Sequence, residues 1–188
     1  FAEHPAVLDA VRRLERRDPA RARKQLLAAR EAVPAHLRPA LDYLVARCDL
    51  LLGWDEEADA GLAQAAQALP ALSRHVAVLR AKAALASGDV ARAERLAGPI
   101  PPHTAGVFDL HRELAERAHA EGRDFTARAF AERAARSVYW GWDQARLTAL
   151  RQAVDARLAG DPDPARRVPG WIALWRTHPR TQAGRDAL

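Results

Sequence analysis

The sequence is organised around an internal repeat of about 35 residues, and no other feature limits the possible folds as strongly. A turn residue recurs at separations of 36, 35, 34 and 38 residues, at Arg17, Gly53, Gly88, Gly122 and Gly160. An alanine stands seven residues before and five residues after each turn residue. These alanines are Ala10, Ala22, Ala46, Ala58, Ala81, Ala93, Ala115, Ala127, Ala153 and Ala165. Small residues at fixed positions let two antiparallel helices cross closely, so the repeat indicates stacked helix pairs.

Composition and patterning favour helix along the whole chain. Alanine, arginine and glutamate are abundant and are strong helix formers, and no segment has the alternating, β-branched pattern of a strand. We therefore predict an all-α protein with one helical-repeat domain over residues 1–188. Its helix pairs are predicted near 5–34, 36–70, 71–98, 105–140 and 143–176, with a terminal helix near 180–188.

Residues around each turn predict how the second helix of a pair begins and ends. An aspartate follows each turn residue by one or two positions, at Asp18, Asp55, Asp89, Asp124 and Asp161. Each can accept a hydrogen bond from a free N–H group in the first turn of the next helix. Pro34 and Pro70 stand seventeen residues after their turn residues, where we expect the second helices of the first two pairs to end.

The helix pairs resemble the tetratricopeptide repeat. The second pair matches the pattern most fully, through Ala46, Gly53, Ala58, Leu62, Ala65 and Pro70. The resemblance covers roughly residues 1–165 and implies a right-handed α-solenoid of about five antiparallel helix pairs. It also implies a scaffold or protein-interaction function, in which the first helix of each pair lines a concave groove that binds a peptide or partner protein.

The groove-facing positions carried over from this resemblance are Tyr43, Arg47, His75, Lys82, Arg112, His119 and Arg157. They are predominantly basic with one aromatic residue, which suits an acidic peptide or an anionic polymer. The alternative, that these are charges on solvated helix faces, stays open. The family's clamp for the carboxyl terminus of a peptide uses asparagine, and this sequence contains none.

A second resemblance lies near the end of the chain, in the segment from Trp171 to Thr181. Alanine-rich repeats that lead into such a Trp…His-Pro segment are similar to the superhelical domain of bacterial soluble lytic murein transglycosylases. This resemblance implies a periplasmic module that positions peptidoglycan. The catalytic Glu-Ser pair of that family does not occur in the sequence, so the module would be non-catalytic. A cytoplasmic location stays open.

No constellation of residues predicts catalysis, a metal or a cofactor. The serines Ser73, Ser87 and Ser137 lack the Gly-x-Ser-x-Gly context of a nucleophile, and no glycine-rich phosphate loop is present. His111 and His119 share a helix face, but the position between them is Ala115, which cannot bind a metal. The sequence has a single cysteine, whereas structural zinc sites usually use two or more, so we expect no zinc site. We expect Cys48 to be a buried structural thiol, and this chain not to be an enzyme.

Charge and hydropathy narrow the range of partners. Lys and Arg outnumber Asp and Glu by 29 to 24, but the basic residues are dispersed, so we expect no nucleic acid. No transmembrane run occurs, and we expect no membrane insertion. Four late tryptophans, Trp140, Trp142, Trp171 and Trp175, suit either a stacking platform for a ligand or packing at the end of the array. Because the chain starts at Phe1 and contains no methionine, we expect it to be processed or excised from a longer one.

Overall fold

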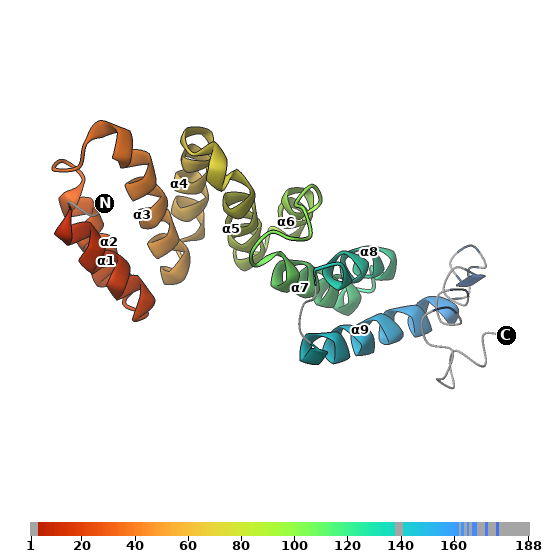
Figure 1. Cartoon of the computed structure of the whole chain (residues 1–188). Coiled ribbons are helices and arrows are strands. Elements are labelled where there is room, and N and C mark those ends of the chain that lie inside the picture. The colour runs from red at the N-terminus through yellow and green to blue at the C-terminus, as the bar shows by residue number, and fades with distance from the viewer. Residues whose placement is uncertain are drawn as a thin grey trace. The chain divides into compact units, whose positions relative to one another are not determined.

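A computed structural model describes residues 4–137 and 141–161, together with positions 163, 165, 167, 168, 172 and 176. Within these residues all regular structure is helical, which confirms the all-α prediction (Figure 1). Contacts divide the chain into two compact units, Phe1–Thr104 and Ala105–Leu188, and each is described by itself. The single domain over residues 1–188 stays a prediction.

The first unit consists of three successive helix pairs. Its helices are α1 (Pro5–Glu15), α2 (Pro19–Ala29), α3 (Arg38–Leu52), α4 (Asp55–Ala68), α5 (Ser73–Ala86) and α6 (Val90–Ala97), with short 3-10 helices η1 (Ala35–Leu37) and η2 (Pro70–Leu72) before α3 and α5. Each helix packs against the next one along the chain.

The second unit has a helix pair followed by one long helix. Its helices are α7 (Val107–Ala120), α8 (Asp124–Ala135) and α9 (Gly141–Ala159). α8 packs against both α7 and α9. The predicted second helix of the fifth pair and the terminal helix near 180–188 lie largely outside the described residues.

Four of the five predicted turn residues adopt the left-handed backbone conformation that ends a helix sharply. The φ angles are 61° at Arg17, 76° at Gly53, 86° at Gly88 and 75° at Gly122. Glycine reaches this region without a steric penalty, whereas a residue with a Cβ is strained there. Gly160 also follows the end of its helix, α9 (Gly141–Ala159), as predicted, but without a positive φ.

The repeat alanines also differ between the first four pairs and the fifth, in whether they are buried. All eight alanines of the first four pairs are buried, and they are Ala10, Ala22, Ala46, Ala58, Ala81, Ala93, Ala115 and Ala127. Ala153 and Ala165, which belong to the fifth pair, are exposed. The close helix crossing that these alanines predict is therefore present in four pairs.

Each apolar cluster in the core takes residues from three successive helices. The first joins α1, α2 and α3 and includes Val7, Leu26 and Leu41, all fully buried. The second joins α3, α4 and α5 through residues that include Leu62 and Val76. The third, in the second unit, consists of Ala118, Ala127, Val154 and Leu158 from α7, α8 and α9. A helix pair thus completes its core with the first helix of the next pair, which is how stacked repeats gain stability.

The predicted aspartate caps are correct in two pairs and wrong in two others. Asp18 and Asp89 each accept the backbone N–H three residues ahead, Arg21 at 3.3 Å and Arg92 at 3.0 Å. Asp55 and Asp124 instead lie inside their helices, one position after the cap. Pro70 lies two residues after the end of α4 at Ala68, whereas α2 already ends five residues before Pro34. The helix that Asp161 would cap lies largely outside the described residues.

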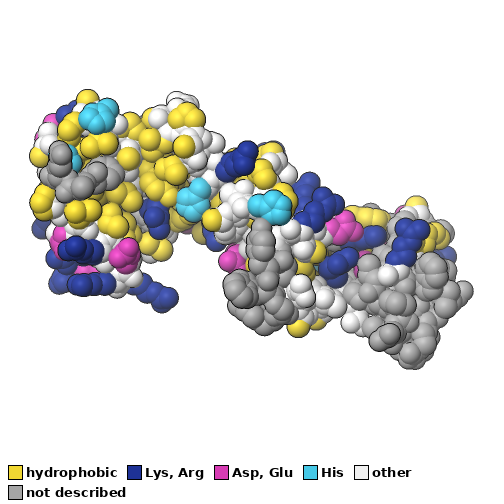
Figure 2. Space-filling model, viewed as in Figure 1, with side chains coloured by type: hydrophobic (Ala, Val, Ile, Leu, Met, Phe, Trp, Pro, Cys, Tyr) yellow, Lys and Arg dark blue, Asp and Glu magenta, His cyan; other side chains and the backbone are white. Residues whose placement is uncertain are grey.

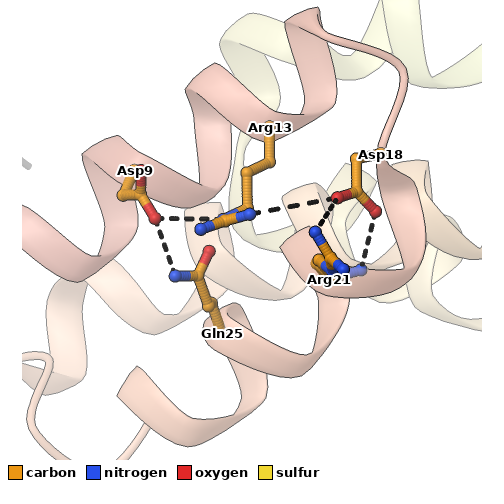
Figure 3. Close-up of polar contacts among 5 residues, drawn as sticks. All are labelled: Asp9, Arg13, Asp18, Arg21 and Gln25. Carbon is orange, nitrogen blue, oxygen red and sulfur yellow. Dashed lines mark hydrogen bonds and ion pairs between the residues drawn. The ribbon is translucent and has the colours of Figure 1, made fainter.

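Polar side chains between α1 and α2 add to the apolar contacts of the first pair (Figure 3). The Asp9 carboxylate accepts from Gln25 Nε2 of α2 at 2.7 Å and from Arg13 Nε of α1 at 3.0 Å. Hydrogen bonds from Gln25 and Arg13 hold the pKa of Asp9 below its usual value.

We predict that Gly61→Ala destabilises the protein, although alanine is the better helix former by about 1 kcal/mol. An added Cβ at Gly61 in α4 would lie 2.9 Å from the Cβ of Ala46 in α3, so the two helices would have to separate. Overpacking of this kind costs about 1–3 kcal/mol. Urea unfolding of both single variants and of Gly61→Ala/Ala46→Gly gives the coupling energy. We expect about 1–3 kcal/mol, and additive effects would contradict the contact.

We also predict that turn substitutions have opposite signs at equivalent positions. Arg17→Gly should raise the free energy of unfolding by about 0.5 kcal/mol, because exposed Arg17 holds a φ of 61° that glycine adopts freely. Gly53→Ala should lower the free energy of unfolding by about 1 kcal/mol. A Cβ there meets no neighbour within 4 Å, so the cost comes only from the left-handed backbone conformation. Thermal unfolding measures both, and effects of equal sign would be inconsistent with a shared turn.

Candidate functional site

Three of the predicted groove residues come together on the first helices of two successive pairs. The rings of Tyr43 in α3 and His75 in α5 meet edge to face, with centroids 6.4 Å apart. The Arg47 guanidinium lies 5.9 Å from the centre of the Tyr43 ring, within the range of a cation–π contact. Tyr43 is buried, while Arg47 and His75 are half-buried. α3 and α5 therefore present this group on one side of the first unit.

Lys82 lies on the same face of α5 as His75, because seven residues are about two helical turns. It is half-buried and, within the described part of the chain, neither Lys82 nor Arg47 forms an ion pair with a carboxylate. We call Tyr43, Arg47, His75 and Lys82 the basic face. Burial raises the pKa of Tyr43, and the charge and hydrogen bond of Arg47 only partly oppose that rise. The tyrosine hydroxyl therefore stays a neutral hydrogen-bonding group.

Other arginines of the first unit are paired with aspartates between neighbouring helices. Arg23 in α2 bonds to Asp49 in α3 at 2.5 Å, and Arg30 bonds to Asp42 at 2.9 Å. These pairs neutralise the charges of carboxylates that are buried or half-buried between the helices. Arg47 differs because its described partner is the uncharged ring of Tyr43.

The second unit brings two more predicted residues together, around a buried aspartate. His119 Nδ1 at the end of α7 lies 2.7 Å from an Asp124 carboxylate oxygen at the start of α8. An ionised carboxylate only accepts, so Nδ1 carries the proton and Nε2 is left as an acceptor. Arg157 of α9 places Nη2 3.3 Å from that Nε2 and donates from Nη1 to the His119 carbonyl at 2.6 Å. The three side chains join three helices.

Arg112 also has acidic neighbours within its own unit. Its Nη1 donates to both carboxylate oxygens of Glu116, at 2.8 and 2.9 Å, and Arg146 of α9 binds the same glutamate. Dark-blue and magenta side chains alternate on the visible face of this unit (Figure 2). Arg112, His119 and Arg157 are thus engaged in contacts with acidic residues that hold the second unit together, whereas Arg47 and Lys82 of the basic face have no such contact among the described residues.

The cysteine and a histidine that could take part in catalysis or metal binding are buried in the core. Cys48 is buried, as predicted, and burial raises the pKa of its thiol to about 11. The thiolate is the nucleophilic form of cysteine, so this side chain is unreactive in the folded state. His111 is buried and packs on Phe130, with ring centroids 5.8 Å apart. Among the described residues, no group of three or more His, Cys, Asp or Glu side chains is arranged to hold a metal ion.

The aromatic cluster predicted late in the sequence cannot be placed, because the side chains of Trp140, Trp142, Trp171 and Trp175 lie outside the described residues. None of the described helices combines the length and apolar character needed to span a bilayer. Asp124 is the residue that sequence reasoning missed at the His119 junction. Its position suggested a helix cap, and only the packing of α9 on α8 brings Arg157 beside it.

Comparison with known proteins adds no relative: no protein-family model matches the chain, and no curated protein is significantly similar to it.

We predict that Asp124→Asn lowers the free energy of unfolding by about 1–3 kcal/mol, because it leaves His119 and Arg157 without their buried charged partner. Asp109→Asn is the matched control, since Asp109 lies on α7 with a largely exposed side chain and should change stability by less than about 0.5 kcal/mol. Denaturant unfolding distinguishes the two. Equal effects would mean that the His119 junction contributes little to the fold.

Proposed function

We propose that this chain is a tetratricopeptide-like right-handed α-solenoid that acts as a protein-interaction module and binds an acidic peptide on its basic face. The contact between Tyr43 and His75, with Arg47 over the tyrosine ring, carries this proposal. It supports an arrangement in which the first helices of successive pairs share one binding surface. The periodic left-handed turns and buried alanines support the repeat architecture.

The charge distribution favours an acidic partner over an uncharged one. Arg47 and Lys82 come from successive first helices and, within the described residues, carry charges that no carboxylate neutralises. A carboxylate of a bound peptide would form charge-assisted hydrogen bonds with them, which are stronger than neutral ones. His75 and the edge of the Tyr43 ring add polar and apolar contact between the two cations. A short acidic peptide bound across α3 and α5 would contact all four side chains of the basic face.

The remaining predicted residues are left out of this binding site for a physical reason. Using Arg112 or Arg157 to hold a ligand would require breaking ion pairs with Glu116 or Asp124. Leaving a buried carboxylate such as Asp124 unpaired is costly. We therefore assign them to the stability of the second unit.

Selection from a displayed random-peptide library, followed by fluorescence anisotropy with the selected peptides, tests the proposal. We predict peptides enriched in Asp and Glu, whose binding weakens as salt concentration rises. The double variant Arg47→Glu/Lys82→Glu should bind at least about tenfold more weakly, equivalent to about 1.4 kcal/mol.

Arg95→Glu is the matched control, because Arg95 is exposed on α6, the second helix of its pair. It should bind within about twofold of the unchanged protein. Equal binding by the control and the double variant, or no enrichment of acidic residues, would rule out the basic face as the site. Circular dichroism confirms that each variant retains its helices.

A further inference from the structure

A separate pocket lies where α2 meets the turn between α3 and α4. It has a volume of about 250 Å³ and is lined by Ala20, Arg23, Lys24, Leu27, Leu52 and Trp54. The four residues from α2 are spaced as one face of a helix. Leu27 and Trp54 are 43% and 45% exposed, which is high for side chains of this size. We refer to this site as the Trp54 pocket.

The repeat itself gives no structural reason for a tryptophan at this position. Trp54 directly follows the turn residue, where the first and third pairs have Asp18 and Asp89 as helix caps. The backbone at Trp54 is the same as at those caps, with φ −93° and ψ 70° against −111° and 69° at Asp18 and −80° and 71° at Asp89. α4 therefore begins without the side-chain cap that its backbone geometry would accept.

The fourth pair also lacks the cap, but its residue there has another use. Arg123 occupies that position and forms an ion pair with Glu121 at 2.8 Å. Trp54 instead leaves nearly half of its side chain in solvent. Trp54 gives up the hydrogen bond that a capping side chain would make, and its ring stays nearly half exposed. A residue that departs from a local rule of the repeat in this way is expected at a binding site.

The charged residues that line the pocket are both cations. The Arg23 guanidinium stacks over the Trp54 ring at 4.8 Å from its centroid, and its Nε is held by buried Asp49. This bond fixes the arginine while its other N–H groups remain able to donate. Lys24 is exposed beside it. The pocket thus offers an apolar floor with positive charge along one wall.

We propose that the Trp54 pocket is a second binding site, which takes an apolar side chain flanked by carboxylates in a peptide segment of a partner protein. Leu27, Leu52 and Trp54 would enclose the apolar side chain, and Arg23 and Lys24 would pair with the carboxylates. A sugar fits less well, because the walls around the indole are aliphatic and offer few partners for its hydroxyl groups. Leu52 lies nine residues after Tyr43, about two and a half turns along α3, so this site is on the opposite side of that helix from the basic face.

The test uses nuclear magnetic resonance of the ¹⁵N-labelled chain, with the Trp54 indole signal assigned from Trp54→Phe. The probe is the peptide acetyl-Asp-Leu-Phe-Glu-amide. We expect it to shift the Trp54 indole signal and the Lys24 and Leu27 amides with a Kd of about 1 mM or tighter. Two control peptides should each bind at least about fivefold more weakly. Acetyl-Asn-Leu-Phe-Gln-amide lacks the carboxylates, and acetyl-Asp-Ala-Ala-Glu-amide lacks the large apolar side chains.

The N-acetylglucosamine tetramer is the competing probe, and we expect no shift from it. The proposal is overturned if the sugar shifts the Trp54 signal more than the peptide does. It is also overturned if the peptide causes no shift at about 10 mM.

Two variants separate binding from folding. Trp54→Ser should melt at the same or a higher temperature, because serine can cap α4 as Asp18 and Asp89 cap their helices, yet its Lys24 and Leu27 amides should no longer respond to the peptide. Leu27→Asp, at an exposed position, should keep its helical circular dichroism and lose binding. Undiminished binding by either variant would exclude the pocket. Arg47→Glu/Lys82→Glu should bind this probe normally, so failure of one site does not imply failure of the other.

Discussion

The close crossing of antiparallel helices at small side chains is the constraint on which the rest of this structure depends. At Ala46 and Gly61 the backbones of α3 and α4 approach so closely that one more Cβ would leave 2.9 Å between carbon atoms. Equivalent alanines are buried in each of the first four pairs. Such proximity lets larger residues beside them, among them Leu62 and Val76, pack into one cluster formed by three helices. Without it, neighbouring pairs would share less apolar surface, and that shared surface is the main source of stability in a repeat array.

Ion pairs between successive helices supplement these apolar contacts and use a recurring position. The residue six positions after the turn is Arg23 in the first pair, Asp59 in the second and Arg128 in the fourth, and each pairs with a charge on the next helix, at Asp49, Arg80 and Asp155. Burial opposes ionisation of Asp59, but Arg80 and Arg92 outweigh it and hold the pKa of that carboxyl below its usual value. The charge at this position is positive in the first and fourth pairs and negative in the second, and the partner on the next helix has the opposite sign in each case.

Two surfaces of the first unit combine a cation with an aromatic ring. They are the basic face, in which Arg47 rests on Tyr43, and the Trp54 pocket, in which Arg23 rests on Trp54. In both, an arginine stacks on an aromatic ring on α3 or at the turn that follows it. Apolar side chains also cover much of the visible surface of this unit (Figure 2). A chain rich in alanine and arginine can thus offer both apolar and cationic contacts without weakening its core.

The sequence alone determined the nine described helices, their order and the turns between the helices of the first four pairs. These features depend on local propensity and on the spacing of small residues and turn residues along the chain. Ala46, Ala58 and Gly53 could be identified by counting, since a small residue or a left-handed turn is required wherever two helices reverse and cross. The sequence also identified Asp18 and Asp89 as helix caps, but only the tertiary structure decided which polar residues pair between helices. His119 and Arg157 are thirty-eight positions apart, and nothing local indicates that Asp124 joins them. Nor could the sequence show that Trp54 is exposed beside Arg23 rather than buried in the turn. Burial and charge pairing depend on which helix packs next to which, and that is a property of the stacked array rather than of any single segment.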